Sequence, residues 1–209
     1  MAERTRGLYS ALSSSRIYSA VQSLLAGRQS ATYLLEDHYR LPESGIVVDV
    51  GCGPGALVES VSRGCRYFGF DPNPDYIEKA NARGKGAFVC GTMSEFLQVY
   101  GAELSGSVDV IVCGGVLHHL TDAQSHELLQ GCHSLLKVGG RLACVEPTRL
   151  IRQDRLSGLM QSFDRGANIR MDYQWVRLLR EHFSEVESRV ANNYNWIPWV
   201  HILLTAIRY

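Results

Sequence analysis

Short apolar runs and helical apolar spacings alternate along most of this chain. The runs predict strands over 46–50, 66–70, 87–90, 108–113 and 141–145. Between them, apolar positions at helical intervals predict helices near 55–63, 74–82, 94–100 and 122–136, and Gly139-Gly140 follows the last of these as a stop signal. Because strands alternate with helices, we expect an α/β domain with a parallel sheet and crossover helices.

The two ends of the chain depart from this alternation. Residues from Leu8 to about Tyr39 have apolar positions at helical intervals and predict N-terminal helices. After Glu146-Pro147 comes an irregular polar stretch, followed by a helix from about Tyr173 to His182 and two strands over 185–190 and 200–207. The chain has 209 residues, which is the size of one compact domain.

The most informative segment follows the first strand and reads Asp49-Val50-Gly51-Cys52-Gly53-Pro54-Gly55. Closely spaced glycines at the end of a strand let the backbone approach a ligand, and Asp71, at the end of the second strand, is placed to bind two ribose hydroxyls. Asp49 would repel a pyrophosphate. S-adenosylmethionine (SAM) carries a sulfonium and an ammonium instead, so the turn favours SAM over a dinucleotide.

These residues resemble the first two motifs of class I SAM-dependent methyltransferases, and the likeness extends over 107–120 and 135–147. The resemblance implies a doubly wound, mostly parallel seven-stranded sheet, with the last two strands forming an antiparallel edge hairpin. It also implies a helical N-terminal cap. We therefore expect one domain over 1–209, divided into a cap (1–44), a SAM-binding core (45–147) and an acceptor-side insertion with the hairpin (148–209).

Other expected cofactor contacts follow the third and fourth strands. In similar proteins an acidic residue after the strand holds the adenine amino group, but here Thr92 occupies that place. Met93 is then expected to cradle the adenine ring, while Ser94 has an alternative role as a helix cap. Cys113, before Gly114-Gly115, is expected near the methionine end of SAM.

His118 and His119 are the candidate general bases, because they follow the fourth strand, whose carboxyl end faces the cleft of an open α/β sheet. Methyl transfer needs a base only if the acceptor must lose a proton. A structural role for each histidine therefore stays open. Glu146, which ends the fifth strand, is expected either to bind the acceptor or to pair with Arg149 or Arg152.

Acceptor contacts are harder to assign. Tyr9 and Tyr18 of the cap and Arg170 after the fifth strand are the candidates. The arginines over 149–170 as a group favour an anionic acceptor, although each one alone is as well explained by a solvated helix face. No group of residues has the spacing of metal ligands, so no metal is expected.

The amino-acid composition limits the classes of binding partner that are expected. Lys plus Arg and Asp plus Glu both total 21, so the formal charge is zero and nothing favours nucleic acid or an anionic membrane. No apolar run reaches membrane-spanning length and no signal-peptide core is present. Six cysteines without paired spacing indicate a reducing, cytoplasmic setting. The oligomeric state is left open.

The prediction is thus a SAM-dependent methyltransferase that acts on a small molecule. Two rivals remain. One is a methyltransferase-like subunit that binds SAM without turnover or activates a partner. The other is an NAD(P) dehydrogenase, since Gly51, Gly53 and Ala56 satisfy the loose dinucleotide pattern, although Asp49 argues against it.

Overall fold

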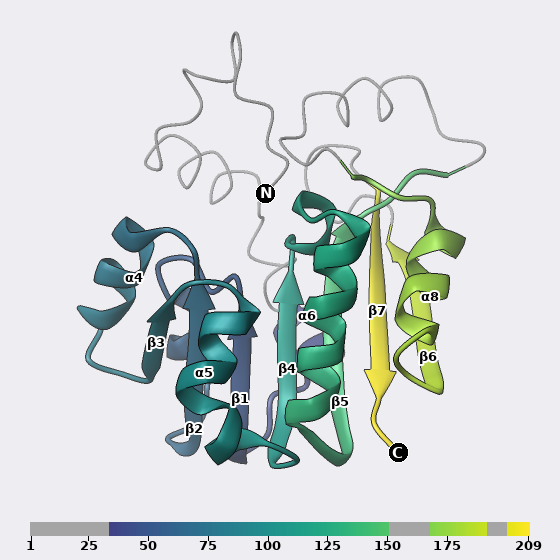
Figure 1. Ribbon diagram of the computed structural model, residues 1–209. Coiled ribbons are helices and arrows are strands. Elements are labelled where there is room, and N and C mark those ends of the chain that lie inside the picture. Colours follow the sequence, from purple (N-terminus) through teal and green to yellow (C-terminus); the bar gives the residue numbers. More distant parts are fainter. Residues whose placement is uncertain (1–33, 151–167, 192–199) are drawn as a thin grey trace, which may run out of the picture.

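The computed structural model describes residues 34–150, 168–191 and 200–209, and within them one seven-stranded sheet forms the centre of the molecule (Figure 1). The strands follow the spatial order β3-β2-β1-β4-β5-β7-β6. Their bounds are β1 Ser44–Val50, β2 Gly64–Asp71, β3 Ala87–Cys90, β4 Val108–Gly114, β5 Leu136–Pro147, β6 Glu185–Ala191 and β7 His201–Ile207. β1 to β5 are mutually parallel, and β7 is antiparallel to both β5 and β6. The predicted α/β fold with an antiparallel edge hairpin is confirmed.

The helices lie on the sheet as the alternating sequence pattern requires. They are α4 Pro74–Asn81, α5 Met93–Leu104, α6 Asp122–Leu135 and α8 Asp172–Arg180, with short turns η1 Leu34–Tyr39, η2 Ala56–Ser60 and η3 Leu117–His119. Figure 1 shows α5, α6 and α8 side by side on one face of the sheet. Apolar residues of η2 and the segment before β1 pack against the opposite face.

Alternation along the strands divides the core into these two faces. Val48 and Val50 of β1 point toward α5 and α6 and join the larger cluster, which includes the fully buried Phe96 and Trp175. Val47, the residue before Val48, points the other way and belongs to a smaller cluster on the opposite face. Because both faces are covered, the central strands are apolar throughout, which is why they were visible in the sequence.

Two predicted elements were wrong in extent. The helix expected over 55–63 is only the 3-10 turn η2, because Gly55 is left-handed (φ 71°) and Val61 is already extended. The segment 136–140, expected to end a helix and form a turn, instead begins β5. Leu136 pairs with Val108, and the register then shifts before Arg141 pairs with Val110, so the glycines are absorbed into an irregular strand.

The expected N-terminal cap lies largely outside the described residues. Only its end is described, where the π-helical turn η1 leads to Tyr39. The Nε2–H group of its buried His38 donates to the Cys144 carbonyl oxygen at 2.9 Å, which ties this end of the segment to β5. The cap itself, and the division of the chain at 44 and 147, stay predictions.

Candidate active site

The turns that follow β1, β2, β3 and β4 meet at one edge of the sheet, where the parallel strands end. The Gly53 amide donates to Asp71 Oδ2 at 3.1 Å, which joins the first turn to the second. The Gly91 amide donates to the Asp71 carbonyl oxygen at 3.1 Å, which brings in the third. Val116, after β4, lies so close to Gly51 that a Cβ there would be 2.5 Å from Val116 Cγ2. Motifs far apart in sequence therefore form one continuous surface.

The glycines of the first turn have two different reasons to be glycine. All three have left-handed backbones, with φ of 65° at Gly51, 53° at Gly53 and 71° at Gly55. A Cβ on Gly51 would collide with Val116, and one on Gly55 would meet Ala80 of α4. Among the described residues, no atom lies within 4 Å of a Cβ placed on Gly53. Packing therefore explains Gly51 and Gly55, whereas Gly53 borders open space and is the position where backbone can approach a ligand.

Asp49 is buried, with 7% of its surface exposed, just before this turn. The Tyr67 hydroxyl donates to Asp49 Oδ2 at 2.5 Å. Burial raises the pKa of the Asp49 carboxyl to about 7; the Tyr67 hydrogen bond opposes this rise, and the nearby charge of Asp71 adds to it. Burial also raises the pKa of the Tyr67 hydroxyl, so the tyrosine is the proton donor of the pair. A cation bound beside Asp49 would favour its ionised form.

Asp71 has both carboxylate oxygens aligned by backbone amides. Oδ2 accepts from Gly53 and Oδ1 accepts from Asn73 at 2.9 Å. Burial raises the pKa of the Asp71 carboxyl, and these two hydrogen bonds lower it. Each oxygen keeps a second lone pair, so the group can still accept from two neighbouring hydroxyls. The cap of the following helix is Asn73, not Asp71, because the Asn73 side chain accepts from the Asp75 amide.

The residues expected around adenine take mainly structural roles. Thr92 caps α5: its amide and its hydroxyl both donate to Glu95 Oε2, and Ser94 is therefore not the cap. The Met93 side chain is buried in the core and faces α6, where it would be 2.5 Å from a Cβ on Gly131. Only the backbone of Met93 is available to a ligand, which corrects the expected side-chain contact.

Cys113 also turns its side chain away from the site. Its thiol is buried in the core cluster together with those of Cys132 and Cys144. A contact between Cys113 and SAM would therefore have to come from the backbone at the end of β4. All six cysteines are free thiols.

Glu146 has a structural role that the sequence did not indicate; its expected contact with an acceptor stays a prediction, and Arg152, one of its expected partners, lies outside the described residues. Its carboxylate is fully buried and accepts from three successive backbone amides: Val116 at 3.0 Å, Leu117 at 2.8 Å and His118 at 3.2 Å. It also lies 2.7 Å from His118 Nδ1. It pairs with no arginine among the described residues, and Arg149 is exposed. Glu146 therefore fixes the turn that carries His118.

The two histidines of that turn are placed differently. His118 is buried, with 5% of its surface exposed, and its Nδ1 faces the Glu146 carboxylate. A carboxylate beside Nδ1 favours the tautomer with the proton on that nitrogen, which leaves Nε2 as the basic one. His119 is half-buried and its ring centroid lies 4.0 Å from that of His118. Among the described residues, the Glu146 carboxylate lies against His118 Nδ1, which is the arrangement that orients a catalytic imidazole.

Arg170, expected to contact the acceptor, has several protein partners in the structure, and its contact with an acceptor stays a prediction. Its guanidinium pairs with Asp122 at 2.6 Å, donates to the Leu117 carbonyl oxygen at 3.4 Å and lies 4.7 Å from the Trp175 ring centroid. These partners connect the Arg170 side chain to the His118 turn, to α6 and to α8. The arginine therefore has a structural role in the protein.

The other acceptor-side candidates lie outside the described residues. These are Tyr9 and Tyr18 of the cap, and the arginines Arg152 and Arg155. The sequence reasoning also missed Tyr39, whose hydroxyl would be 3.0 Å from a Cβ on Gly114. It missed the role of Tyr67 as well. The register of β1 and β2 explains this contact. Tyr67 is paired with Val47, and Asp49, two residues after Val47, lies on the same face of the sheet.

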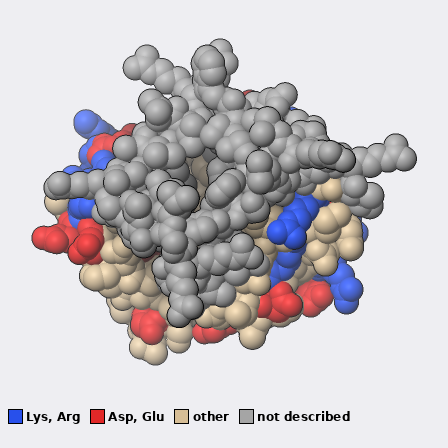
Figure 2. All heavy atoms as spheres, turned by 90° about the horizontal axis from the view of Figure 1, so that it is seen from above, with Lys and Arg blue, Asp and Glu red and all other residues tan. Residues whose placement is uncertain are grey.

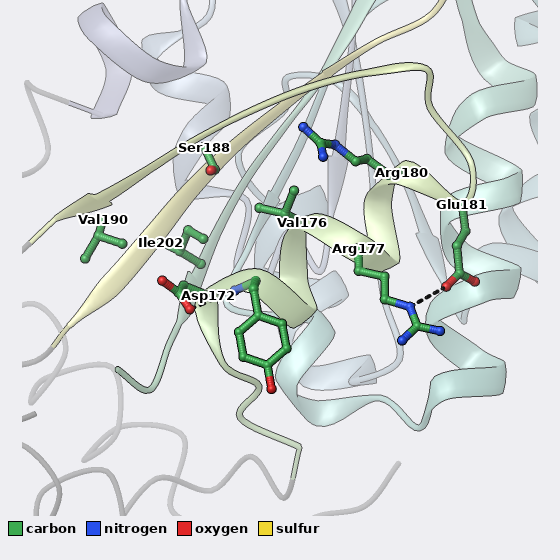
Figure 3. Close-up of a pocket in the computed structure, with 9 residues that line it drawn as sticks. Asp172, Val176, Arg177, Arg180, Glu181, Ser188, Val190 and Ile202 are labelled. Atoms are coloured by element: carbon green, nitrogen blue, oxygen red, sulfur yellow. Dashed lines mark hydrogen bonds and ion pairs between the residues drawn. The ribbon is translucent and has the colours of Figure 1, made fainter. Parts of the chain in front are cut away.

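A cavity of about 580 Å³ lies elsewhere, between α8 and the edge hairpin (Figure 3). Its walls combine charged and apolar residues, among them Asp172, Arg177, Arg180, Glu181, Val176 and Ile202. Figure 3 shows Arg177 turned toward Glu181, and the two are 3.7 Å apart. Strands β4, β5 and β7 separate this cavity from the glycine turn, so it is not part of the site built above.

Charged side chains of both signs are visible on the face of the molecule seen from above (Figure 2). Figure 2 shows acidic and basic side chains both present around the rim of the upper face. In the ranges that the structure describes, no helix is long and apolar enough to cross a membrane. No group of three or more metal-ligating side chains is present in those ranges either.

Comparisons with known proteins agree with this geometry. A family model described as a methyltransferase domain matches residues 47–140. The ubiquinone biosynthesis O-methyltransferase of Xanthomonas axonopodis pv. citri is 33% identical over 106 residues, and that of Escherichia coli is 36% identical over 97 residues. Residues 47–140 therefore match a methyltransferase domain, in agreement with the class I SAM-dependent methyltransferase motifs of the sequence. The two alignments cover 48% and 45% of this chain but only 42% and 39% of the relatives, so less than half of each relative is matched.

Solved structures show how widely the methyltransferase fold is shared. A SAM-dependent methyltransferase from Archaeoglobus fulgidus has a TM-score of 0.67 at 16% identity and covers 90% of this chain and 99% of its own. Phosphoethanolamine N-methyltransferase 2 of Haemonchus contortus has a TM-score of 0.72 at 12% identity, and the match covers 96% of this chain and 59% of the other. Geranyl diphosphate C-methyltransferase of Streptomyces coelicolor has a TM-score of 0.65 at 16% identity, and the match covers 94% of this chain and 87% of the other. The names include N- and C-methyltransferases, so the fold does not fix the acceptor atom.

Proposed function

We propose that this chain transfers a methyl group from SAM to a small-molecule acceptor. The observation that carries the proposal is the junction of the first two turns, where Gly53 is left-handed, borders open space and donates to Asp71. Backbone that can approach a ligand and a carboxylate set for two hydroxyls meet there, and the buried Asp49 lies just before them. This set suits a nucleoside joined to a cationic group.

The donor set also explains the preference for SAM over a phosphorylated coenzyme. Two carboxylates, Asp49 and Asp71, stand at the first turn, and burial raises the pKa of both because water no longer stabilises their charge. A ligand with a positive charge relieves that penalty, whereas a pyrophosphate increases it. In this assignment Asp71 binds the ribose, the glycine turn follows the methionine part, and Asp49 lies toward the cationic groups.

SAM supplies an activated methyl group with a neutral leaving group, so little acid–base chemistry is left for the protein to perform. The chain's own contribution is to align the two reactants and to remove a proton if the acceptor carries one. His118 is the group placed for that, with its Nδ1 committed to Glu146. An acceptor proton would therefore be taken at Nε2.

We further propose that the accepting atom is oxygen. The curated relatives are named O-methyltransferases at 33–36% identity, and a hydroxyl is an acceptor that must lose its proton. A carboxylate-oriented histidine beside the site serves that need. The anionic character expected of the acceptor now depends on Arg149 and on arginines outside the described residues, since Arg170 is engaged.

Calorimetry with SAM, S-adenosylhomocysteine and NADH tests the cofactor, and one pair of variants tests the site. Gly53→Ala and Gly84→Ala both place a Cβ on a left-handed residue (φ 53° and 67°), and no atom of the described residues lies within 4 Å of either Cβ. Their conformational cost is therefore the same, of the order of 1–2 kcal/mol. We expect Gly53→Ala to weaken SAM binding more than tenfold and Gly84→Ala, beyond α4, to leave it unchanged. Equal effects, or tight NADH binding without SAM binding, would refute the assignment.

Turnover requires its own measurement. Release of S-adenosylhomocysteine should be followed with a panel of phenols, hydroxy acids and amines, and with a small-molecule extract of cells. We expect hydroxyl compounds to be methylated. SAM binding without product from any of these would instead identify a silent methyltransferase-like subunit. The six free thiols are the basis for proposing a cytoplasmic setting.

A further inference from the structure

The turn that carries His118 has little structure of its own. η3 is a single 3-10 turn with two backbone hydrogen bonds. The His119 amide donates to the Val116 carbonyl oxygen at 3.0 Å, and the Leu120 amide donates to the Leu117 carbonyl oxygen at 3.1 Å. Short 3-10 turns have strained hydrogen-bond geometry and do not hold a side chain in place alone. What lies around the turn must therefore fix the position of the imidazole.

Glu146 holds one side of the turn by its amide groups, as described above. The other side presents carbonyl groups, and these are held by a segment about fifty residues later in the sequence. The Asn168 amide donates to the His118 carbonyl oxygen at 3.0 Å, and Asn168 Nδ2 donates to that of Leu120 at 2.8 Å. Arg170 Nη1 donates to the Leu117 carbonyl oxygen at 3.4 Å.

This second segment is itself anchored. The Arg170 carbonyl oxygen accepts from the Arg149 amide at 3.1 Å and from the buried Thr148 hydroxyl at 3.2 Å, just beyond β5. The Arg170 guanidinium pairs with Asp122 at the start of α6 and lies over the Trp175 ring of α8. The anchor therefore connects the His118 turn to β5, α6 and α8 at once.

We propose that Asn168 and Arg170 are positioning residues for His118. Together with Glu146 they hold the turn from both sides, so that the imidazole keeps its Nδ1 against the carboxylate. Asn168 is the more specific of the two, because its side-chain amide and its backbone amide bind different carbonyl groups of the same turn. The inference rests on the proposed function only in taking His118 as the base; the placement of the ring can be tested without it.

The decisive variant is Asn168→Asp, which has the same shape but replaces the Nδ2 donor with a carboxylate oxygen that the Leu120 carbonyl group repels. Asn168→Ala removes the side chain altogether. Asn81→Ala is the matched control, because Asn81 is an exposed residue that ends α4 on the far side of the sheet. Arg170→Lys keeps the charge for Asp122 but not the forked guanidinium.

The first readout is the NMR signal of the His118 ring proton on Nδ1, measured without any ligand and assigned with His118→Gln. We expect Asn168→Asp and Asn168→Ala to shift or broaden this signal and Asn81→Ala to leave it unchanged. The second readout is turnover: kcat should fall about 10- to 100-fold, the effect of misplacing a catalytic group by about 1 Å, with the Kd for SAM within twofold of wild type. The pH profile of kcat should shift as well.

An unchanged Nδ1–H signal and unchanged kcat in Asn168→Ala, even with a lower thermal midpoint, would overturn the inference and leave Asn168 a purely structural residue. A wild-type protein that binds no SAM and releases no product would instead overturn the proposed function. In that case the ring signal would still report whether Asn168 positions His118.

Discussion

Asp49→Asn is the substitution for which the structure gives the sharpest expectation, because it should act in opposite directions on stability and on binding. The Asp49 carboxyl is buried against the Tyr67 hydroxyl, and its pKa is about 7 instead of 3.8. The folded protein therefore holds an extra proton between these two pH values. The free energy of unfolding should fall as the pH rises through this window, and the loss is complete above about pH 7.

The size of the effect follows from the same two values. A rise in pKa from 3.8 to about 7 corresponds to about 4 kcal/mol, at about 1.4 kcal/mol for each pH unit. Asparagine removes the charge and keeps an oxygen for Tyr67, so without ligand the variant should be more stable than wild type at pH 8 by about 1–4 kcal/mol. At pH 4, where Asp49 is protonated in the folded protein, the two should be nearly equal.

SAM binding should respond to pH and to Asp49→Asn in the direction opposite to stability. A cationic ligand favours ionised Asp49, so below pH 7 SAM must displace a proton and its affinity should rise with pH, by up to about 50-fold from pH 5 to 7, before it levels off above pH 7. Asp49→Asn should bind SAM weakly and with a flat profile. Calorimetry across pH, together with urea unfolding at pH 4 and 8, measures both effects. A flat wild-type profile, or a variant less stable at pH 8, would refute the electrostatic reasoning.

Further variants test the rest of the site. Asp71→Asn replaces a charged acceptor of two amides and should weaken SAM binding by about 10- to 100-fold, corresponding to roughly 1–3 kcal/mol, as read by calorimetry; unchanged affinity would exclude a ribose contact. Glu146→Gln should destabilise the protein by about 1–3 kcal/mol in urea unfolding, because its amide nitrogen faces buried donors, and should also lower kcat. His118→Gln should lower kcat with hydroxyl acceptors and leave the Kd for SAM unchanged; full activity would show that no base is needed.

The sequence was a good guide wherever function depends on local backbone or on burial. All seven strands were placed within a few residues of their true bounds, apart from the start of β5, because strands buried on both faces are apolar throughout. The glycine turn and Asp71 were recognisable because strand end, glycine spacing and carboxylate lie within one short stretch. The helix expected over 55–63 failed because a left-handed Gly55 and an extended Val61 outweigh helical periodicity.

The chain by itself thus determined the order of strands and helices, the turn that can approach a ligand and the acidic character that suits a cationic one. Only the tertiary structure decided what Glu146, Asn168 and Arg170 do. Each was a polar residue with several plausible partners, and hydrogen-bond partners fifty residues apart are chosen by the packing of β5, α6 and α8 rather than by local pattern. Burial fixed the outcome: once Glu146 lost contact with water, its carboxylate had to take the amides and imidazole of the neighbouring turn.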